Sequence, residues 1–139
     1  MNASIKARGL SLVELLIVVT LVAVLGAISY PSYQNHLQAT KRYQAQTNLY
    51  QLQIWLEQQY TANANYPNTV NCTECQLSKF YDFAIKLDNQ KSGYQITATP
   101  KLGSGQEHDP CFMQTLTHLS VPGSQDEMGN NIEMKTCWR

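Results

Sequence analysis

Apolar residues are concentrated at the start of the chain. From Leu10 to Ile28 the sequence reads LSLVELLIVVTLVAVLGAI, nineteen residues with a single charge at Glu14. As a helix, such a run is about 28 Å long at about 1.5 Å per residue, which is enough to cross the hydrocarbon core of a bilayer. The pattern therefore predicts a membrane-spanning helix near the N-terminus.

A second helical pattern extends from Tyr33 to Tyr60, a stretch without glycine or proline. Its apolar residues recur mostly at steps of three and four, which places them on one face of an amphipathic helix. Asparagine favours helix ends and Pro67 cannot continue a helix, so we expect the helix to end between residues 62 and 68. The apolar face is expected to pack on a sheet, with a core formed by Leu49, Leu52, Leu56 and Tyr60.

Beyond residue 79 the pattern becomes that of strands. Residues 80–87 and 94–99 are separated by the turn-forming cluster 88–93, which predicts an antiparallel hairpin. Two further strands are expected around residues 113–121 and 132–138, divided by Pro122-Gly123 and by Gly129-Asn130-Asn131. A helix packed on an antiparallel sheet of about four strands is an α+β architecture.

Pro31 lies between the two helical patterns. Proline removes a backbone hydrogen bond and clashes with the preceding turn, so it kinks or ends a helix. One interpretation is that the first helix ends near Tyr30 and a second begins at Ser32. The other is a single long helix that is kinked at Pro31.

Composition and charge narrow the possible functions. The chain has 139 residues, the size of one domain, with ten basic and ten acidic side chains. This balance argues against a protein that wraps nucleic acid through its overall charge. Lys6 and Arg8 precede the apolar run, so the positive-inside tendency keeps the amino end in the cytoplasm and sends the residues after Tyr30 across the membrane.

The start of the apolar run resembles the class III signal of type IV prepilins. Gly9 is followed by a hydrophobic residue, three further residues, Glu14 and an unbroken apolar helix. The resemblance implies cleavage between Gly9 and Leu10 by a prepilin peptidase and N-methylation of Leu10, a position where pilins usually carry phenylalanine. A carboxylate inside a membrane usually has a partner. In this family Glu14 would neutralise the N-terminal amine of a neighbouring subunit during assembly.

The rest of the chain also resembles pilins. The segment from Ala84 to Pro100 and the closing Cys137-Trp138 are similar to those of PilE-type minor pilins and related competence pilins. The resemblance implies the type IV pilin fold, a long N-terminal helix packed on an antiparallel sheet. It further implies a leader peptide at 1–9, a transmembrane and filament-core helix at 10–31, and an extracytoplasmic head at 32–139.

A pilin of this kind would be a structural subunit with no enzymatic activity and no cofactor. It would sit in the inner membrane with its N-terminus in the cytoplasm, and then enter an extracellular type IV pilus that supports twitching motility, adhesion or DNA uptake. Its partners would be the prepilin peptidase, other pilin subunits and the assembly machinery of the inner membrane.

Two alternatives stay open within this resemblance. A competence pilin would bind DNA, but removal of the leader leaves eight basic and ten acidic side chains, so DNA would need a local basic patch. A type II secretion pseudopilin typically has a calcium loop and lacks disulfides, whereas Asp126, Glu127 and Glu133 are too few for such a loop. The candidates for a DNA-binding patch are Lys79, Lys86, Lys91, Lys101, Lys135 and Arg139.

Four cysteines lie in the part expected to be extracytoplasmic, which favours two disulfides in one of three connectivities. We predict Cys72–Cys75, which would brace the loop between helix and sheet, and Cys111–Cys137, which would close a C-terminal loop like the one in pilins. The alternatives for Cys72 and Cys75 are a redox motif or half of a zinc site completed by His108 and Cys111. We predict no metal site.

Overall fold

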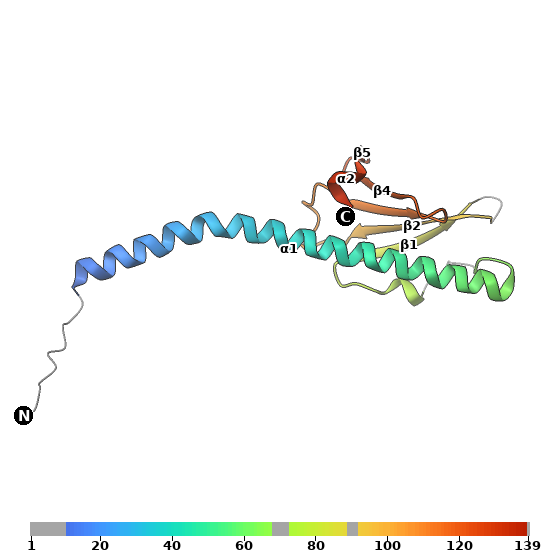
Figure 1. Ribbon diagram of the computed structural model, residues 1–139, viewed down its shortest axis with the longest axis horizontal. Helices are drawn as coiled ribbons and strands as arrows, with labels where there is room; N and C mark the ends of the chain where they lie inside the picture. The colour runs from blue at the N-terminus through green and yellow to red at the C-terminus, as the bar shows by residue number, and fades with distance from the viewer. Residues whose placement is uncertain (1–10, 68–72, 89–91, 139) are drawn as a thin grey trace, which may run out of the picture. The chain divides into compact units, whose positions relative to one another are not determined.

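The structure is a computed structural model, and it describes residues 11–67, 73–88 and 92–138 (Figure 1). The chain divides into two units, residues 1–36 and 37–139. One long helix, α1 (Leu12–Asn63), contributes to both. The remaining elements belong to the second unit and form a sheet with two short helical segments.

The first part of α1 is apolar and exposed. It contains an 18-residue window with a mean hydropathy of 2.6 and no buried residue, so it is long and apolar enough to cross a membrane. Pro31 lies inside α1. The interpretation that one helix ends near Tyr30 and another begins at Ser32 is therefore wrong, because the loss of one hydrogen bond at a proline does not end this helix.

Helix α1 ends where the sequence predicts, at Asn63. Ala64 follows in the left-handed conformation, with φ of 53°. Its N–H donates to the Tyr60 carbonyl over 2.8 Å, which satisfies one of the last helical carbonyls. The chain then turns back towards the sheet.

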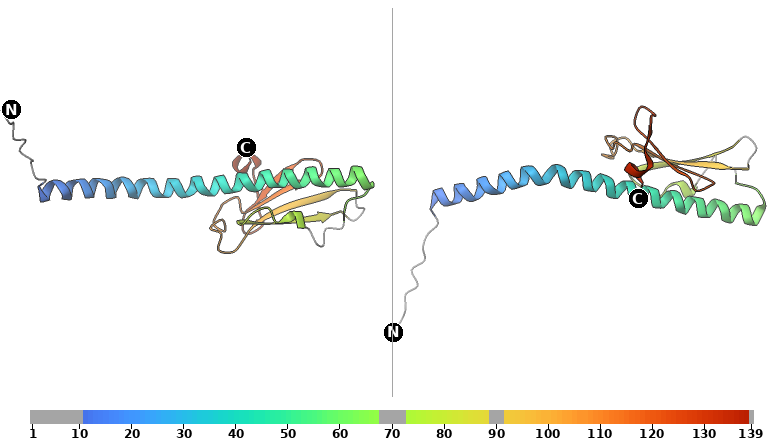
Figure 2. Two further views of the ribbon diagram at one scale, coloured as in Figure 1. Left: turned by 90° about the horizontal axis from the view of Figure 1, so that it is seen from below. Right: turned by 45° about the horizontal axis from the view of Figure 1, so that its top comes forward.

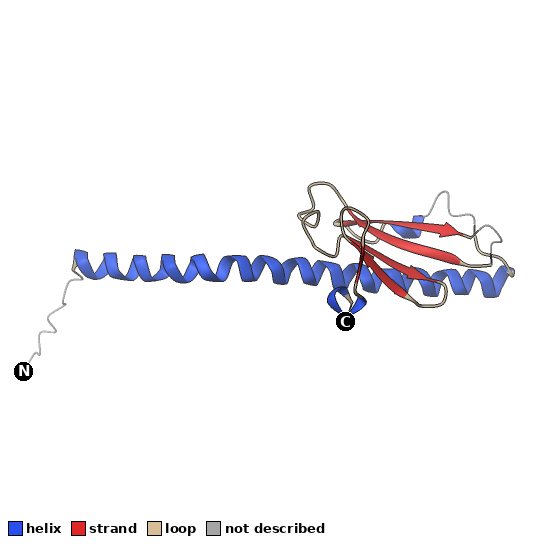
Figure 3. Cartoon of the chain, turned by 90° about the horizontal axis from the view of Figure 1, so that it is seen from above, coloured by secondary structure: helices blue, strands red, loops and turns tan. Residues whose placement is uncertain are grey.

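The sheet is antiparallel, with the order β1-β2-β3-β4-β5. Its strands are β1 (Tyr81–Leu87), β2 (Tyr94–Pro100), β3 (Met113–Thr117), β4 (Pro122–Gln125) and β5 (Asn131–Ile132). Strands β1 and β2 form the predicted hairpin, in a register that pairs Ile85 with Ile96. The two views in Figure 2 and the view in Figure 3 show these strands on one side of the C-terminal half of α1.

The core lies between this half of α1 and the sheet. Leu49, Leu52 and Leu56 are buried, as predicted, and they meet the alternating inward residues of the first two strands. Alternation is the signature of a sheet with one covered face. The buried apolar residues of these two strands are Tyr81, Phe83, Tyr94, Ile96 and Ala98.

The prediction that Tyr60 is a core residue is wrong. Its side chain is 44% exposed and stacks on Tyr66, with ring centroids 4.7 Å apart. Tyr66 is buried in its place and makes an edge-to-face contact with Tyr94 at 4.9 Å. The helical period continues through Tyr60, but the chain that folds back after Asn63 brings another tyrosine into the core.

The C-terminal part differs from the expected strands. The turn between β3 and β4 lies at residues 118–121, where Ser120 has φ of 58°, and Pro122 begins β4 instead of dividing two strands. Residues 132–138 are not a strand: β5 ends at Ile132 and a helical turn, α2 (Met134–Cys137), follows. A proline is tolerated at the first residue of a strand, which explains its position.

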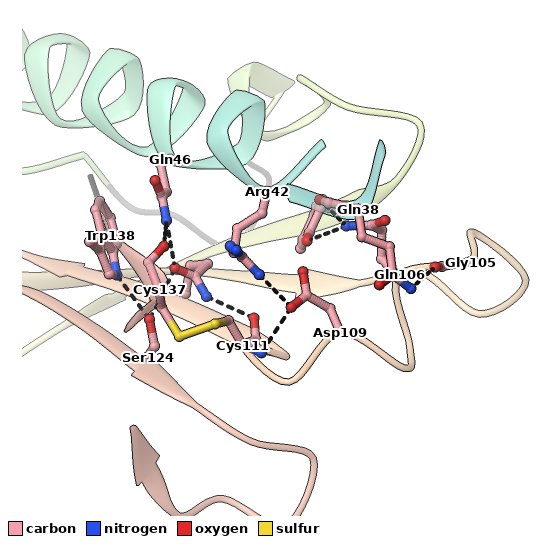
Figure 4. Close-up of polar contacts among 12 residues, drawn as sticks. Gln38, Arg42, Gln46, Gly105, Gln106, Asp109, Cys111, Ser124, Cys137 and Trp138 are labelled. Atoms are coloured by element: carbon pink, nitrogen blue, oxygen red, sulfur yellow. Dashed lines mark hydrogen bonds and ion pairs between the residues drawn. A yellow bond between two sulfur atoms is a disulfide. The ribbon is translucent and has the colours of Figure 1, made fainter. Parts of the chain in front are cut away.

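A disulfide joins the C-terminal turn to the loop between β2 and β3. Cys111 and Cys137 are bonded, as predicted. The indole N–H of Trp138 donates to the Ser124 hydroxyl over 2.9 Å, and the Gln46 amide donates to the Cys137 carbonyl over 2.7 Å (Figure 4). Cys137 and Trp138 are therefore attached to both α1 and β4.

Candidate functional site

Basic side chains gather around Phe80, the residue that precedes β1. The Lys41 ammonium lies 4.3 Å from the centroid of the Phe80 ring, and the Lys79 ammonium lies 5.0 Å from it. Both distances are those of cation–π contacts. Helix α1 supplies Lys41 and the loop before β1 supplies Lys79, so the fold brings together two lysines that are far apart in sequence.

Lys101 extends this group. It follows β2, and its ammonium donates to the Ser78 carbonyl over 3.0 Å. It also forms an ion pair with Asp82 at 3.4 Å, but the Asp82 side chain is 72% exposed, so the pair is weak and screened by salt. We call Lys41, Lys79 and Lys101 the lysine cluster.

A pocket of about 400 Å³ adjoins the lysine cluster, between α1 and the segment Leu77–Phe80. Asn48 donates to the Leu77 carbonyl over 3.4 Å at this place. Amide and hydroxyl groups beside ammonium groups suit a polyanion that also presents hydrogen-bonding edges, which is the chemistry of a nucleic acid. The helix residues that line the pocket are Gln44, Thr47 and Asn48.

At the other end of the described chain, Glu14 lies in the first turn of α1. Its carboxylate accepts the Ser11 N–H over 3.4 Å, while the Ser11 hydroxyl accepts the Val13 N–H over 3.3 Å. This arrangement is a capping box in which the hydroxyl bonds the second helical N–H instead of the third: the carboxylate accepts the Ser11 N–H and the hydroxyl satisfies one free N–H of the first turn. Glu14 therefore has a partner within its own chain.

Comparison with known families identifies the chain. Residues 31–117 match the family described as type IV minor pilin ComP, DNA uptake sequence receptor, and residues 5–30 match the prokaryotic N-terminal methylation motif. The chain belongs to this family of type IV minor pilins. The predicted resemblance is confirmed, and of the two alternatives the family matches the competence pilin and not the secretion pseudopilin.

Solved structures confirm the fold of this minor pilin. A type IV pilin from Shewanella oneidensis is 24% identical, with a TM-score of 0.56, and the match covers 73% of this chain and 98% of that one. The non-core minor pilin PilV of Neisseria meningitidis is 15% identical, with a TM-score of 0.57, and the match covers 71% and 94%. No curated protein matches the sequence.

The remaining predicted site residues of the minor pilin are distributed as follows. Gly9, Leu10, Cys72, Lys91 and Arg139 lie outside the described residues. Lys86 is exposed on β1, the strand that begins directly after Phe80. Lys135 is on α2, which contacts β4, a strand that is not adjacent to β1 in the sheet.

Cys75 is disulfide-bonded, and Cys111 is bonded to Cys137 in a separate disulfide. The zinc alternative that required a Cys111 thiolate is therefore wrong. Within residues 11–67, 73–88 and 92–138, no group of three His, Cys, Asp or Glu side chains is placed to hold a metal ion.

Two features of the site, the place of Lys41 in the lysine cluster and the cap formed by Ser11 and Glu14, are not among the features predicted from the sequence. Lys41 belongs to the lysine cluster only because α1 packs beside Phe80, a contact that no local pattern reveals. The capping box was visible as Ser11-Leu12-Val13-Glu14, a serine followed three residues later by a glutamate, at the start of an apolar run.

Proposed function

We propose that this minor pilin binds duplex DNA for uptake, and that the lysine cluster holds the DNA backbone. The observation that carries the proposal is the convergence of Lys41 and Lys79 on the Phe80 ring, at 4.3 Å and 5.0 Å. The description of the family, DNA uptake sequence receptor, supports the same ligand.

Charge supports a local interface and not a general one. Four of the five lysines described in the second unit lie near β1. Lys41 and Lys79 are at Phe80, the residue before β1, Lys86 is in β1, and Lys101 pairs with Asp82 of β1. The acidic side chains Glu107, Asp126 and Glu127 surround a separate pocket beside the loop from β2 to β3 and the turn from β4 to β5. A basic patch on one side permits binding of phosphates despite a net charge near zero.

The test is the salt dependence of DNA binding. Full-length protein in detergent micelles is titrated with a labelled duplex at several salt concentrations, as wild type and as Lys41→Gln/Lys79→Gln/Lys101→Gln. Each lysine that neutralises a phosphate adds about 0.9 to the slope of log affinity against log salt, so the triple variant should lose up to about 2.7 from that slope.

Lys135→Gln removes one lysine charge from α2 and serves as the control for the effect of each single charge, with no expected change beyond a small, salt-screened one. Equal affinity and slope in the triple variant and the wild type would exclude the lysine cluster as the interface. Absence of binding by the wild type would exclude the function itself.

We also propose that the chain matures as a prepilin. Cleavage between Gly9 and Leu10 by a prepilin peptidase would leave a methylated Leu10, a filament-core helix at 10–31 that is kinked at Pro31, and a head at 32–139 on the outer side of the inner membrane. Mass spectrometry of the chain from cells with and without the peptidase tests this directly. A chain that keeps residues 1–9 in both strains would contradict the proposal.

Glu14 would then act in two states. Its carboxylate caps its own helix in the single subunit, and its proposed partner in the filament is the amine of a neighbouring Leu10. Ser11→Ala removes only the hydroxyl that caps Val13, whereas Glu14→Gln removes the charge. We expect Ser11→Ala to enter pili and Glu14→Gln to be depleted from sheared pili, with equal amounts of both in the membrane. Equal entry of both variants would remove Glu14 from the assembly mechanism.

The proposal assigns this chain a structural and DNA-binding role and no catalytic one. Its partners would be other pilin subunits, the peptidase and DNA.

A further inference from the structure

The loop between β2 and β3, residues 101–112, is attached to α1 by polar contacts on one helix face. Gln38 and Lys41 are three residues apart on this face. The Gln38 amide donates to the Gly105 carbonyl over 3.2 Å, and the Lys41 ammonium donates to the Ser104 carbonyl over 3.4 Å. Lys41, which lies over the Phe80 ring, is therefore also held by this loop.

A buried ion pair anchors the same loop. The Arg42 Nη1 atom lies 2.5 Å from Asp109 Oδ1, and the side chains are 12% and 0% exposed (Figure 4). The Cys111 N–H donates to the same carboxylate oxygen over 2.9 Å. Asp109 Oδ2 is buried and has no hydrogen-bond partner in the described part of the chain, so Arg42 supplies the main compensation for this charge.

Gln106 connects the loop to the start of β1. Its side chain is buried, and its amide donates to the Gln38 carbonyl over 3.1 Å and to the Tyr81 hydroxyl over 2.9 Å. The backbone N–H of Lys101 donates to the Phe80 carbonyl over 2.9 Å. The loop thus contacts α1 and the Phe80 segment, the two parts of the chain that must be held together for the lysine cluster to exist.

We propose that Asp109 is a positioning residue for the lysine cluster. Its ion pair with Arg42 holds the loop against α1, and the loop in turn keeps Lys41 over Phe80 and Lys101 beside Ser78. Asp109 is too deeply buried to touch DNA. In its role for DNA binding, this inference rests on the proposed function, but the position of Lys41 is measurable without DNA.

Removal of the Asp109 charge shows how the ion pair with Arg42 would position the loop. Asparagine at position 109 keeps the size of the side chain and removes its charge, so the Arg42 guanidinium stays buried without a counter-charge. Such a charge is strongly unfavourable unless the structure opens to solvent. The loop is expected to move away from α1, and Lys41 then loses the Ser104 carbonyl.

The measurement is the chemical shift of the Lys41 ε-methylene group in full-length, lysine-labelled protein in micelles. Because Lys41 and Lys79 both lie over the Phe80 ring, the resonances of both are shifted by the ring. Lys41→Gln identifies the Lys41 resonance by its disappearance, and Phe80→Leu measures how much of its shift the ring induces. In Asp109→Asn we expect more than half of the ring-induced shift to disappear while the protein stays folded by circular dichroism.

Asp126→Asn is the matched control. Asp126 accepts hydrogen bonds from Asn130 within the turn between β4 and β5, so its loss removes an acidic charge from another loop. We expect the Lys41 shift to stay at its wild-type value in this variant. An unchanged Lys41 shift in folded Asp109→Asn would overturn the inference, because it would leave Asp109 with a role in stability alone.

DNA binding gives an independent readout. Displacement of Lys41 alone should lower affinity about eightfold near 0.1 M salt and reduce the salt slope by about 0.9. In a Lys41→Gln/Lys101→Gln background, Asp109→Asn should have no further effect on affinity. A further loss in that background would overturn the positioning role, whereas a wild type that does not bind DNA would overturn only the proposed function.

If Asp109→Asn does not fold, Arg42→Lys replaces it in both experiments. Lysine keeps the positive charge but does not offer the planar guanidinium group, so the loop should be held less closely. A partial loss of the Lys41 ring-induced shift is expected. A wild-type shift in folded Arg42→Lys would count against the inference in the same way.

Discussion

The disulfide between Cys111 and Cys137 should provide a large part of the stability of the second unit. The two cysteines are 26 residues apart in sequence. In the chain-entropy model, a cross-link that closes a loop of this length lowers the entropy of the unfolded chain by about 12 cal/mol/K, which is about 3.5 kcal/mol at 25 °C. Domains of this size have a total stability of only about 5–15 kcal/mol.

The experiment compares full-length protein in micelles with the variant Cys111→Ala/Cys137→Ala. Trp138 packs beside the disulfide and makes an edge-to-face contact with Tyr50 at 6.1 Å, so tryptophan fluorescence reports unfolding of this region in urea. With a urea dependence of about 1–3 kcal/mol/M, the loss of stability should lower the midpoint by roughly 1–3.5 M. The contacts of Gln46 and Trp138 remain, so the variant should still fold.

The predicted bond between Cys72 and Cys75 supplies the control. It would close a loop of about three residues, for which the same model gives only about 1.6 kcal/mol. The variant Cys72→Ala/Cys75→Ala should therefore lose about half as much stability as the other pair. The reasoning would be refuted if both pairs cost the same, or if the Cys111→Ala/Cys137→Ala variant lost less than about 1 kcal/mol.

Two further predictions concern the sheet. Burial raises the pKa of Tyr81 from 10.0 to about 12, so the unfolded state releases this proton first and stability should fall between pH 10 and pH 12, by about 1.4 kcal/mol per pH unit. Urea unfolding of Tyr81→Phe should show a smaller alkaline slope than wild type, and an identical slope would contradict the burial of this hydroxyl. A Cβ atom at Gly123 would lie 2.7 Å from the Thr115 hydroxyl in the sheet, so Gly123→Ala should cost about 1–3 kcal/mol and Thr115→Ala should restore most of it. Gly93→Ala meets the exposed His118 ring at the same distance and should cost less, because that ring can rotate away; thermal unfolding of the three variants is the measurement, and an equal loss at Gly93 and Gly123 would refute this explanation.

The parts of the fold that the sequence predicts correctly are those in which local periodicity and burial coincide. Leu49, Leu52 and Leu56 follow the helical period, and the hairpin of β1 and β2 follows the strand period, so both are predictable from the sequence. Tyr60 follows the same helical period but is exposed. Whether a periodic residue is covered depends on where the sheet ends, and that is decided by tertiary contacts.

The C-terminal segment shows the opposite case. Residues 132–138 contain apolar and β-branched residues that suit a strand, yet the strand ends at Ile132 and Met134–Cys137 form a helical turn. The disulfide from Cys137 to Cys111 and the hydrogen bond from Gln46 to the Cys137 carbonyl fix the chain where a continued strand would leave the core. Four-residue segments carry too little local preference to resist such contacts.

The lysine cluster illustrates why composition alone does not identify the binding surface. The acidic and basic side chains of the whole chain balance, which argues against DNA binding when charge is treated as a single number. The fold separates most of the lysines from one group of acidic side chains: α1 and two loops bring Lys41, Lys79 and Lys101 to the segment of Ser78 and Phe80, where Asp82 is the acidic neighbour. Glu107, Asp126 and Glu127 lie beside another pocket. The charge that matters for DNA binding is then the local charge of the lysine cluster beside β1, not the net charge of the chain. Since the loop held by Asp109 sets the position of two of these three lysines, the affinity for a polyanion depends on a buried acidic residue that contributes a negative charge to the total.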